Sequence, residues 1–508
     1  MSCRVAVSSV AVICLAGCTP MRDAPTYRPR ALDRANSIVR NTPAVATQPA
    51  AALGQQSALS LNDCIEIALK SNRRISIADR RVLIARDRVS EAIAMTMPQL
   101  SVEGRFTSRN NDSGIQRPAP SLRNQLRQSL TQAAATSLVE QAGLTPTGQF
   151  LQPTGAGPSF SGTFSERDVW TSRVSLIVPI YDFGRSEFVR QVQEGRVQTA
   201  RYDARRERQD VAFAVSQSYY RILEAEKIKR VVEESIRVVE RQLEIARDFQ
   251  SQGLVAANDV LAAEVQLAER RQQLSQAENN IQLAIATLNR QIGADVTEPT
   301  TVVDVLEVEP WRGRFTDALM LAIGTRPDLA SVRRQIEIAR DEYRATRAEG
   351  TAPRIFGFAD YNWSSDEFLL NNEWLSGGVA VQIPIFDGGV TIARLQRQRK
   401  EIAETVDRYD EQVDNIVLDI KQSYLNVNES AGRIPVARKA VELGEENLRI
   451  VRDQYGEGLL TSADVLTEED RLSQARSNYY QSLYDYHSSY ARLVHAIGGE
   501  PPAETQGP

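Results

Sequence analysis

Few residues of this chain have the type and spacing needed for acid–base or metal chemistry. The 508 residues include only two histidines, His487 and His495, eight positions apart. Two histidines supply too few ligands for the usual His-based zinc or iron sites and too few groups for most His-dependent catalysis. The signatures GxxxxGK[ST], GxSxG and HExxH are missing from the sequence. We therefore expect a protein that is not an enzyme and that holds neither a metal nor another bound cofactor.

The cysteines indicate a different chemistry, the covalent attachment of lipid. Arg4 precedes an apolar run over 5–15, as in a secretory signal, and Leu15-Ala16-Gly17-Cys18 resembles the bacterial lipobox. In a lipobox the cysteine becomes the lipidated first residue of the mature chain. The alternative is an ordinary secretion signal with an incidental cysteine. We expect a signal peptide over 1–17, a lipid on Cys18, and a tether over 18–58 that is rich in Pro, Ala, Thr and Gln.

Composition narrows the class of the remaining chain. Hydrophobic residues make up 42% and charged residues 25%, so most of the chain can fold. The formal charge of −5 gives no basic excess to attract nucleic acid. Cys64 is the only cysteine after Cys18, so an internal disulfide is excluded from the body of the protein. No uninterrupted apolar stretch reaches the roughly 20 residues of a transmembrane helix.

An internal repeat organises the chain. Pro179 and Pro384 are 205 residues apart, and the same offset relates later landmarks. These are Gly253-Leu254 with Gly458-Leu459, Asp259 with Asp464, and Ile292-Gly293 with Ile497-Gly498. The sequence therefore predicts a first repeat over 59–293, a linker over 294–313, a second repeat over 314–499 and a tail over 500–508. The first copy also carries an inserted loop of about 108–168.

Each repeat combines two hydrophobic periods. Alternating segments predict hairpins over about 99–179 and 354–385, with strands of about ten residues, a length that crosses a bilayer. Apolar residues at coiled-coil spacing predict long helices over about 182–251 and 387–456, each a rod of roughly 100 Å. Return helices follow over about 254–292 and 460–498. The fold class is therefore mainly α with a small transmembrane β part, built from two structural repeats.

Four strands are too few for a closed barrel. In lipid, an open sheet edge leaves backbone groups without partners, and the smallest barrels have about eight strands. If the strands enter a membrane, several copies must share them around a cyclic axis.

Taken together, these features resemble the TolC-type outer-membrane factor family, over about 59–499. The resemblance rests on the Pro-Ile-[Tyr/Phe]-Asp-x-Gly junctions after residues 178 and 383 and on the two Gly-Leu turns. It implies a homotrimer whose 12-stranded outer-membrane barrel continues into a 12-helix periplasmic α-barrel. It also implies an exit duct that works with a periplasmic adaptor and an inner-membrane pump. Many efflux members carry an N-terminal lipid, so we expect a lipid-anchored protein of the outer membrane.

The resemblance assigns the turns to adaptor binding. It makes Gly253, Leu254, Gly458 and Leu459 candidate contacts for the adaptor tip. Turn chemistry alone is the alternative, because a helix reversal favours glycine at a positive φ.

The resemblance also places three gate candidates near the closed end, namely Asp464, Asp259 and Tyr455. Three copies of Asp464 would form a lumenal carboxylate ring that favours cations. The family's second aspartate is Thr467 here. Both aspartates could instead cap the returning helices. Asp259 and Tyr455 match a hydrogen-bonded latch, so Tyr455→Phe is expected to raise conductance, whereas the arginine of the family's other latch corresponds to Leu460.

Several functional readings remain open. The expected lipid favours small-molecule efflux, and type I protein secretion is the alternative within the duct class. A lipid-tethered periplasmic coiled-coil scaffold or adaptor is the alternative from another class.

Pro435 lies inside the second long helix, where a proline removes a backbone hydrogen bond, so we expect a kink near 432–435.

Overall fold

A computed structural model describes residues 58–108, 168–253, 255–305, 311–365 and 372–499. The expected signal peptide, the lipid on Cys18, the tether up to residue 57, Leu254 and the tail over 500–508 lie outside these residues. The same holds for residues 109–167 of the insertion.

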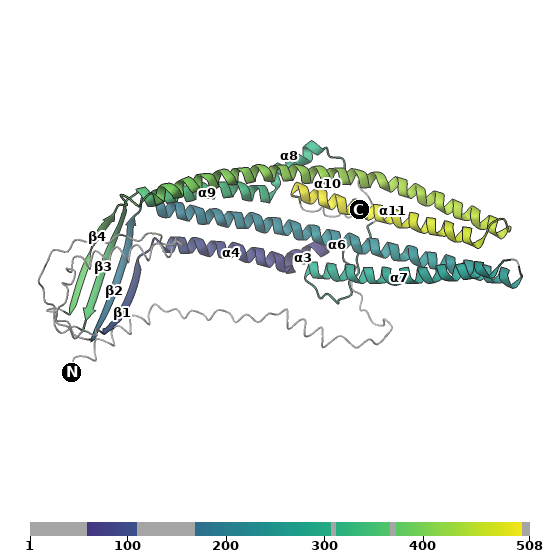
Figure 1. Cartoon of the computed structure of the whole chain (residues 1–508), viewed down its shortest axis with the longest axis horizontal. Helices are drawn as coiled ribbons and strands as arrows, with labels where there is room; N and C mark the ends of the chain where they lie inside the picture. Colours follow the sequence, from purple (N-terminus) through teal and green to yellow (C-terminus); the bar gives the residue numbers. More distant parts are fainter. Residues whose placement is uncertain (1–57, 109–167, 254, 306–310, 366–371, 500–508) are drawn as a thin grey trace. The chain divides into compact units, whose positions relative to one another are not determined.

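The two repeats contain the same elements in the same order (Figure 1). In the first repeat these are α3 (Leu61–Ser71), α4 (Arg73–Ala94), β1 (Gln99–Ser108), β2 (Asp168–Tyr181), α6 (Arg185–Ser251) and α7 (Ala257–Ile292). In the second they are α8 (Phe315–Thr325), α9 (Pro327–Thr351), β3 (Arg354–Ser364), β4 (Glu373–Gln382), α10 (Val390–Gly456) and α11 (Ser462–Ile497). The long helices α6 and α10 both have 67 residues and the return helices α7 and α11 both have 36. All four boundaries keep the offset of 205.

Both long helices begin three residues later than the sequence predicts. The residue before each helix is a glycine in the left-handed region, Gly184 at φ 86° and Gly389 at φ 87°. A side chain is strained at such a φ, so these glycines mark the change from strand to helix. Pro435 does not end α10, which is one helix from Val390 to Gly456.

The four strands form one antiparallel sheet in the order β1-β2-β3-β4. Pairing of β2 with β3 joins the two repeats, from Thr171 opposite Ser364 to Tyr181 opposite Ile355. At 14 residues β2 is longer than expected. Among the described residues β1 pairs only with β2 and β4 only with β3, so the sheet has two open edges.

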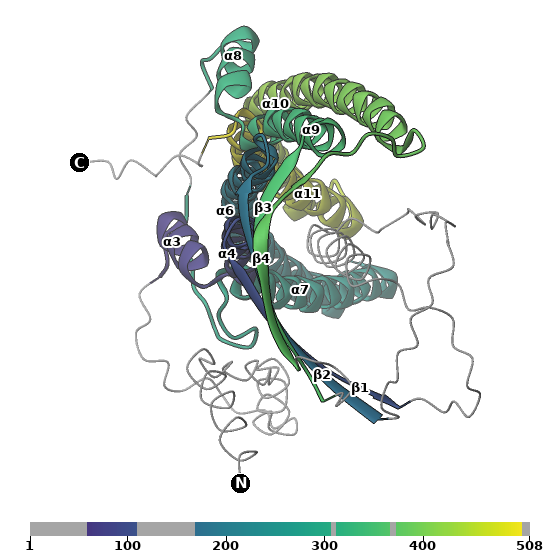
Figure 2. The ribbon, with the colours of Figure 1, turned by 90° about the vertical axis from the view of Figure 1, so that its left-hand side faces the viewer.

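The helices form a layer in which α6 is central. It contacts α4, α7, α9 and α11, whereas α10 contacts α8, α9 and α11. In Figure 1, α4 and α7 follow one another along α6, and α9 and α11 do so along α10. Figure 2 shows α3 and α8 on one side of this layer, away from α7 and α11. No helix in the described part of the chain is both long and apolar enough to cross a membrane.

Polar side chains at the breaks between α3 and α4 and between α8 and α9 donate hydrogen bonds to the last carbonyls of the return helices. The Ser71 hydroxyl donates to the Ile292 carbonyl (2.7 Å), and the Asn72 amide donates to that of Gln291 (2.6 Å). In the second repeat Thr325 donates to Ile497 (2.8 Å). These side chains satisfy carbonyls that a helix end leaves without intrahelical donors.

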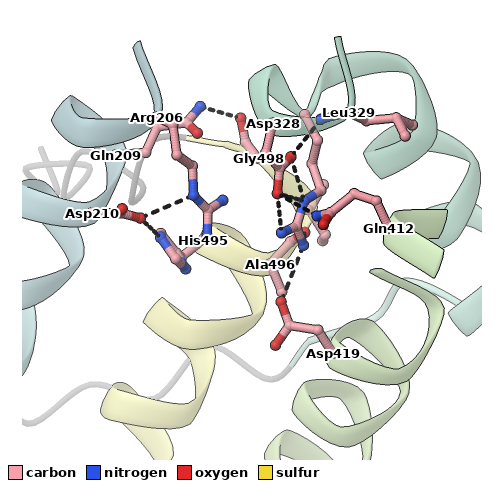
Figure 3. A network of polar contacts seen from close by, with 12 residues as sticks. Arg206, Gln209, Asp210, Asp328, Leu329, Gln412, Asp419, His495, Ala496 and Gly498 are labelled. Atoms are coloured by element: carbon pink, nitrogen blue, oxygen red, sulfur yellow. Dashed lines mark hydrogen bonds and ion pairs between the residues drawn. The ribbon is translucent and has the colours of Figure 1, made fainter. Parts of the chain in front are cut away.

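We call the contact of a helix break with the end of a return helix a joint. The second joint, between the α8–α9 break and α11, carries more charge than the first, between the α3–α4 break and α7. The Arg326 guanidinium donates to the carbonyl of Ala496 (2.9 Å) and to Asp419 on α10 (3.1 Å), and both acceptor residues are labelled in Figure 3. Nearby, His495 Nε2 lies 2.6 Å from an Asp210 carboxylate oxygen that also contacts Arg206 (3.0 Å). The second joint therefore ties α11 to both long helices.

The linker between the repeats is anchored by polar groups. The Tyr219 hydroxyl donates to the Val303 carbonyl (2.5 Å), and the Tyr484 hydroxyl donates to Asp304 (2.9 Å). Lys227, which is buried on α6, forms an ion pair with the same aspartate. The linker thus covers one face of α6 at the level where the repeats meet.

Candidate functional site: the turns and the seam between the helix pairs

The site expected from the sequence lies where α6 turns into α7 and α10 into α11. We call α6 and α7 the first pair and α10 and α11 the second pair. The contact between the two pairs of one chain is the intrachain seam.

Glycine is required at both turns by backbone conformation. Gly253 has φ 70° and Gly458 has φ 76°, and nothing lies within 4 Å of a Cβ built on either residue. The Gly458 N–H donates to the Tyr455 carbonyl (3.0 Å), and the Leu459 N–H donates to that of Gln454 (2.9 Å). These bonds cap α10, which is the turn-chemistry alternative. Leu459 is 69% exposed, so it remains free to meet a partner.

Asp464 caps its own helix. Its carboxylate accepts from the N–H (2.9 Å) and the hydroxyl (2.7 Å) of Thr461, and these bonds lower the pKa of Asp464. The equivalent residue before α7 is Ala256, which has no hydroxyl to pair with Asp259. The two aspartates of the repeat are therefore held differently. A lumenal ring of Asp464 stays a prediction, because it requires three copies.

The latch expected between Asp259 and Tyr455 is wrong within this chain. The Tyr455 side chain is buried, and its hydroxyl has no hydrogen-bond partner among the described residues. The ring packs in an apolar cluster with Leu448 and Val465 and lies 5.7 Å from the ring of Phe249 on α6. Burial raises the pKa of Tyr455. The rise in conductance expected for Tyr455→Phe therefore loses its basis in a direct bond.

Other polar pairs, which sequence reasoning missed, join the two helix pairs. The Gln242 amide on α6 donates to the Ser462 hydroxyl on α11 (3.1 Å), and both residues are buried. Farther from the turns, Asp470 on α11 accepts from Gln266 on α7 (2.9 Å). Arg270 on α7 forms an ion pair with the same aspartate.

The next contact along α11 binds three helices together. Arg476 pairs with Glu234 on α6 (2.9 Å) and with Glu445 on α10 (2.8 Å).

Glu469 on α11 is buried: it is 3% exposed and lies 3.6 Å from the Arg452 guanidinium. Burial raises the pKa of Glu469 despite the arginines around it. In the repeat, Asp470 corresponds to Val265 and Ser462 to Ala257. These polar residues at positions that are apolar in the first repeat were the sequence signal for the polar contacts between the two pairs.

A groove lies along the face of α6 that the linker does not cover. It has a volume of about 770 Å³ and runs between α7 and α11, lined by residues that include Gln217, Arg221, Glu224, Asn280 and Asp485. Burial and the charge of Asp485 raise the pKa of Glu224. Its lining also includes apolar side chains such as Ile228 and Leu283, so the groove is of mixed character.

The two histidines have structural roles in this fold. His487 stacks on Tyr220, with ring centroids 5.1 Å apart, and burial lowers its pKa to about 4. His495 stacks on Phe213 (4.7 Å) beside its contact with Asp210. No group of three or more His, Cys, Asp or Glu side chains within the described ranges could hold a metal ion.

Long paired helices that end in tight turns, with a short antiparallel sheet at the opposite end, define an outer-membrane channel fold. The model of the family described as outer membrane efflux protein matches residues 64–294 and 318–499. The chain belongs to this family, whose members are channel proteins. The resemblance seen in the junctions and turns is confirmed, as are the fold class and the function as an outer-membrane duct.

Individual relatives are distant. The alkaline protease secretion protein AprF of Pseudomonas aeruginosa is 23% identical over 64% of this chain and 69% of its own. The outer membrane protein TolC of Vibrio cholerae is 23% identical over 57% of this chain and 68% of its own. The crystal structure of the outer membrane protein VceC of Vibrio cholerae aligns with a TM-score of 0.66 at 18% identity, covering 87% of this chain and 97% of VceC.

Proposed function

We propose that three copies of this chain form a passive exit duct in the outer membrane for small molecules. An inner-membrane pump drives the transport, and a periplasmic adaptor connects the pump to the duct. The observation that carries the proposal is a sheet at one end of the paired helices whose two outer strands pair with no further strand in the described part of the chain. In lipid those edges need partners, and a second copy supplies them when its β1 pairs with β4 of the first.

Three copies satisfy this requirement with a closed ring. The four strands of each chain make a 12-stranded barrel, and the helices below it make a 12-helix α-barrel. The groove between α7 and α11 then faces the aqueous lumen, since the opposite face of α6 is covered by the linker.

The ends of the duct have separate roles in this proposal. The turns at the periplasmic end, with Gly253, Leu254, Gly458 and Leu459, dock on the adaptor. Of the described residues among these four, Leu459 presents an exposed side chain to it. A lipid on Cys18 anchors each chain in the outer-membrane lipid. The gate candidates Asp464, Asp259 and Tyr455 lie beside the turns and act through the intrachain seam.

Two measurements test the proposed function. Purified from outer membranes in detergent, the protein should run as a heat-labile trimer and form ion-conducting pores in planar bilayers. A water-soluble monomer that forms no pore would instead support the scaffold alternative. Labelling cells with radioactive palmitate should mark the wild type, whereas a Cys18→Ala variant should remain unlabelled.

A second cargo class is suggested by one relative. AprF is named for the secretion of an alkaline protease, so type I protein secretion is the alternative within the duct class. Deleting the chromosomal gene separates the two readings. Loss of small-molecule resistance with an unchanged set of secreted proteins supports efflux, and the opposite pattern supports protein secretion.

A further inference from the structure

The groove between α7 and α11 contains a glutamate whose charge is not balanced. Glu224 on α6 lines this groove and is half-buried. No hydrogen bond or ion pair to another described residue holds its carboxylate. Asp485 in the same lining differs, because its carboxylate lies 3.1 Å from the Arg433 guanidinium of α10. Glu224 is therefore the acid of the groove that lacks a counter-charge.

The internal repeat shows what is missing beside Glu224. Its equivalent, 205 positions later, is Glu429 on α10. Glu429 forms an ion pair with Arg433, which lies one helical turn farther on (2.9 Å). On α6 the residue in the place of Arg433 is Ile228, which also lines the groove. The first repeat thus keeps the carboxylate and has an apolar side chain where the second repeat has the counter-charge.

The one cationic side chain in the described lining does not neutralise Glu224. Arg221 is exposed and forms no ion pair with this carboxylate. Water screens the attraction between such charges, so the effect of Arg221 is weak. Burial and the carboxylate of Asp485 raise the pKa of Glu224, as expected for an acid that has no close cation.

Apolar surface lies on both sides of the carboxylate. Ile228 on α6 and Leu283 on α7 line the groove, and Leu283 is 59% exposed. Alanines at 225 and 277 leave room between the helices. The volume of about 770 Å³ is within the range of sites that bind small organic molecules. A groove of this size, with one unbalanced carboxylate and apolar walls, matches an organic cation with an apolar body.

We propose that this groove is a transit site for amphipathic organic cations. The carboxylate of Glu224 attracts the charged group, and Ile228 and Leu283 contact the apolar body. The inference rests on the proposed duct, in which the groove faces the lumen, and it names a class of cargo for that duct. By symmetry, three copies of the site lie at the same height in the lumen.

The open side of the groove suits passage rather than storage. Water reaches the carboxylate, so it attracts a cation without holding it tightly. Contact with the apolar walls adds affinity in proportion to the area that is covered. Conduction needs binding that is strong enough for entry and weak enough for release. Binding at this site is therefore rapid and reversible.

Two probes with the same apolar body and opposite permanent charge test the site. They are 4-phenylbutyltrimethylammonium, a cation, and 4-phenylbutanesulfonate, an anion. Each is added to a single channel in a planar bilayer, and the current is compared with that of the same channel before the addition. The cation should cause brief, reversible blocks of the current, and the anion should cause several-fold fewer.

Matched variants of the two repeats show whether Glu224 is the responsible acid. Glu224→Gln removes the charge and keeps the size of the side chain, and it should lower the frequency of cation blocks several-fold. Glu429→Gln is the control, because its carboxylate is already paired and Arg433 keeps Asp485 as a partner. This control should block as often as the wild type. Ile228→Arg supplies the missing counter-charge and should act like Glu224→Gln.

Equilibrium dialysis of the detergent-solubilised protein gives a second readout, which does not depend on pore formation. The protein should take up less of the cation when it carries Glu224→Gln than when it carries Glu429→Gln. Uptake of the anion should be the same for both variants. The current of each variant before the probe is added shows that the variant is folded.

Equal blocking frequencies for Glu224→Gln and Glu429→Gln would overturn the inference. So would an anion that blocks the wild type as often as the cation, or equal uptake of the cation by the wild type and Glu224→Gln. A wild-type protein that forms no pore refutes the proposed function instead. Dialysis still decides the binding site in that case, so the two failures are distinguishable.

Discussion

At the scale of single residues, the turns show how a local backbone requirement can be separated from a partner site. Gly253 and Gly458 share a positive φ and have free space around them, so the conformation alone requires glycine. Asp464 is committed to capping α11 through Thr461. Leu459 serves the turn through its backbone N–H, whereas its side chain is 69% exposed.

Gly458→Ala should destabilise the protein by about 1–2 kcal/mol, because an L-residue is strained at this φ. Chemical denaturation in detergent measures the loss. Gly456→Ala is the matched control, since Gly456 is the last residue of α10 and has no heavy atom near its Cβ position. The control should be neutral or slightly stabilising, as alanine favours a helix. Equal losses in both variants would show that φ is not the cause.

Glu469 should make stability depend on pH. Its pKa is raised in the folded protein, so the protonated form is favoured there. The stabilising contribution is complete below the ordinary pKa of glutamate and is lost as pH rises through the raised value. Glu469→Gln should therefore raise the melting temperature at pH 7 and change it little at pH 4. The exposed Glu404→Gln serves as the control, and an equal rise at both pH values would contradict this account.

At the scale of elements, the linker acts as a clasp between the repeats. Asp304 binds Lys227 of α6 and the Tyr484 hydroxyl of α11 at once. Burial acts to raise the pKa of Asp304, but its two partners outweigh burial and the pKa is lowered. A segment between two repeats thus fixes how their long helices lie.

Asp304→Ala should cost about 3 kcal/mol or more, because it leaves buried Lys227 without a counter-charge. Tyr484→Phe is the comparison, since it removes one hydrogen bond to the same carboxylate and should cost about 1 kcal/mol. Thermal unfolding of the detergent-solubilised protein gives both values. A loss for Asp304→Ala no greater than that for Tyr484→Phe would rule out the buried charge as the cause.

At the scale of the whole molecule, the single chain is an incomplete object. Within the described ranges its sheet has two open edges, and Leu425 on α10 and Leu261 on α7 are exposed although their repeat equivalents, Tyr220 and Leu466, are covered. Each of these surfaces is complementary to another surface of the same chain. Head-to-tail association therefore satisfies all of them together, provided that the ring closes.

Moving the intrachain ion pair to the contact between copies tests this complementarity. Val265→Asp places a carboxylate in the apolar contact and should lower the dissociation temperature of the trimer by several degrees. Adding Ala475→Arg, the repeat equivalent of Arg270, should restore much of the loss. Semi-native gels over a temperature series measure both effects. The association of α7 with the second pair of another copy is wrong if Val265→Asp leaves the trimer unchanged.

The sequence by itself determined the repeat, the kinds of element and most boundaries. Helix and strand periods and the glycines at 253 and 458 depend on neighbours along the chain, so they can be read from local spacing. The long helices begin three residues later than predicted, because Gly184 and Gly389 adopt a positive φ that the hydrophobic period does not reveal.

Only the tertiary structure decided which residues meet across the seam. Asp259 and Tyr455 matched a hydrogen-bonded pair of the family. In the structure, however, the Tyr455 ring packs in an apolar cluster, and Gln242 donates a hydrogen bond to Ser462. The ion pair of Arg270 with Asp470 was not apparent beforehand. Contacts of this kind depend on the axial register and rotation of long helices that are far apart in the chain. A small change in either one exchanges the partners, whereas the periods that form the helices stay the same.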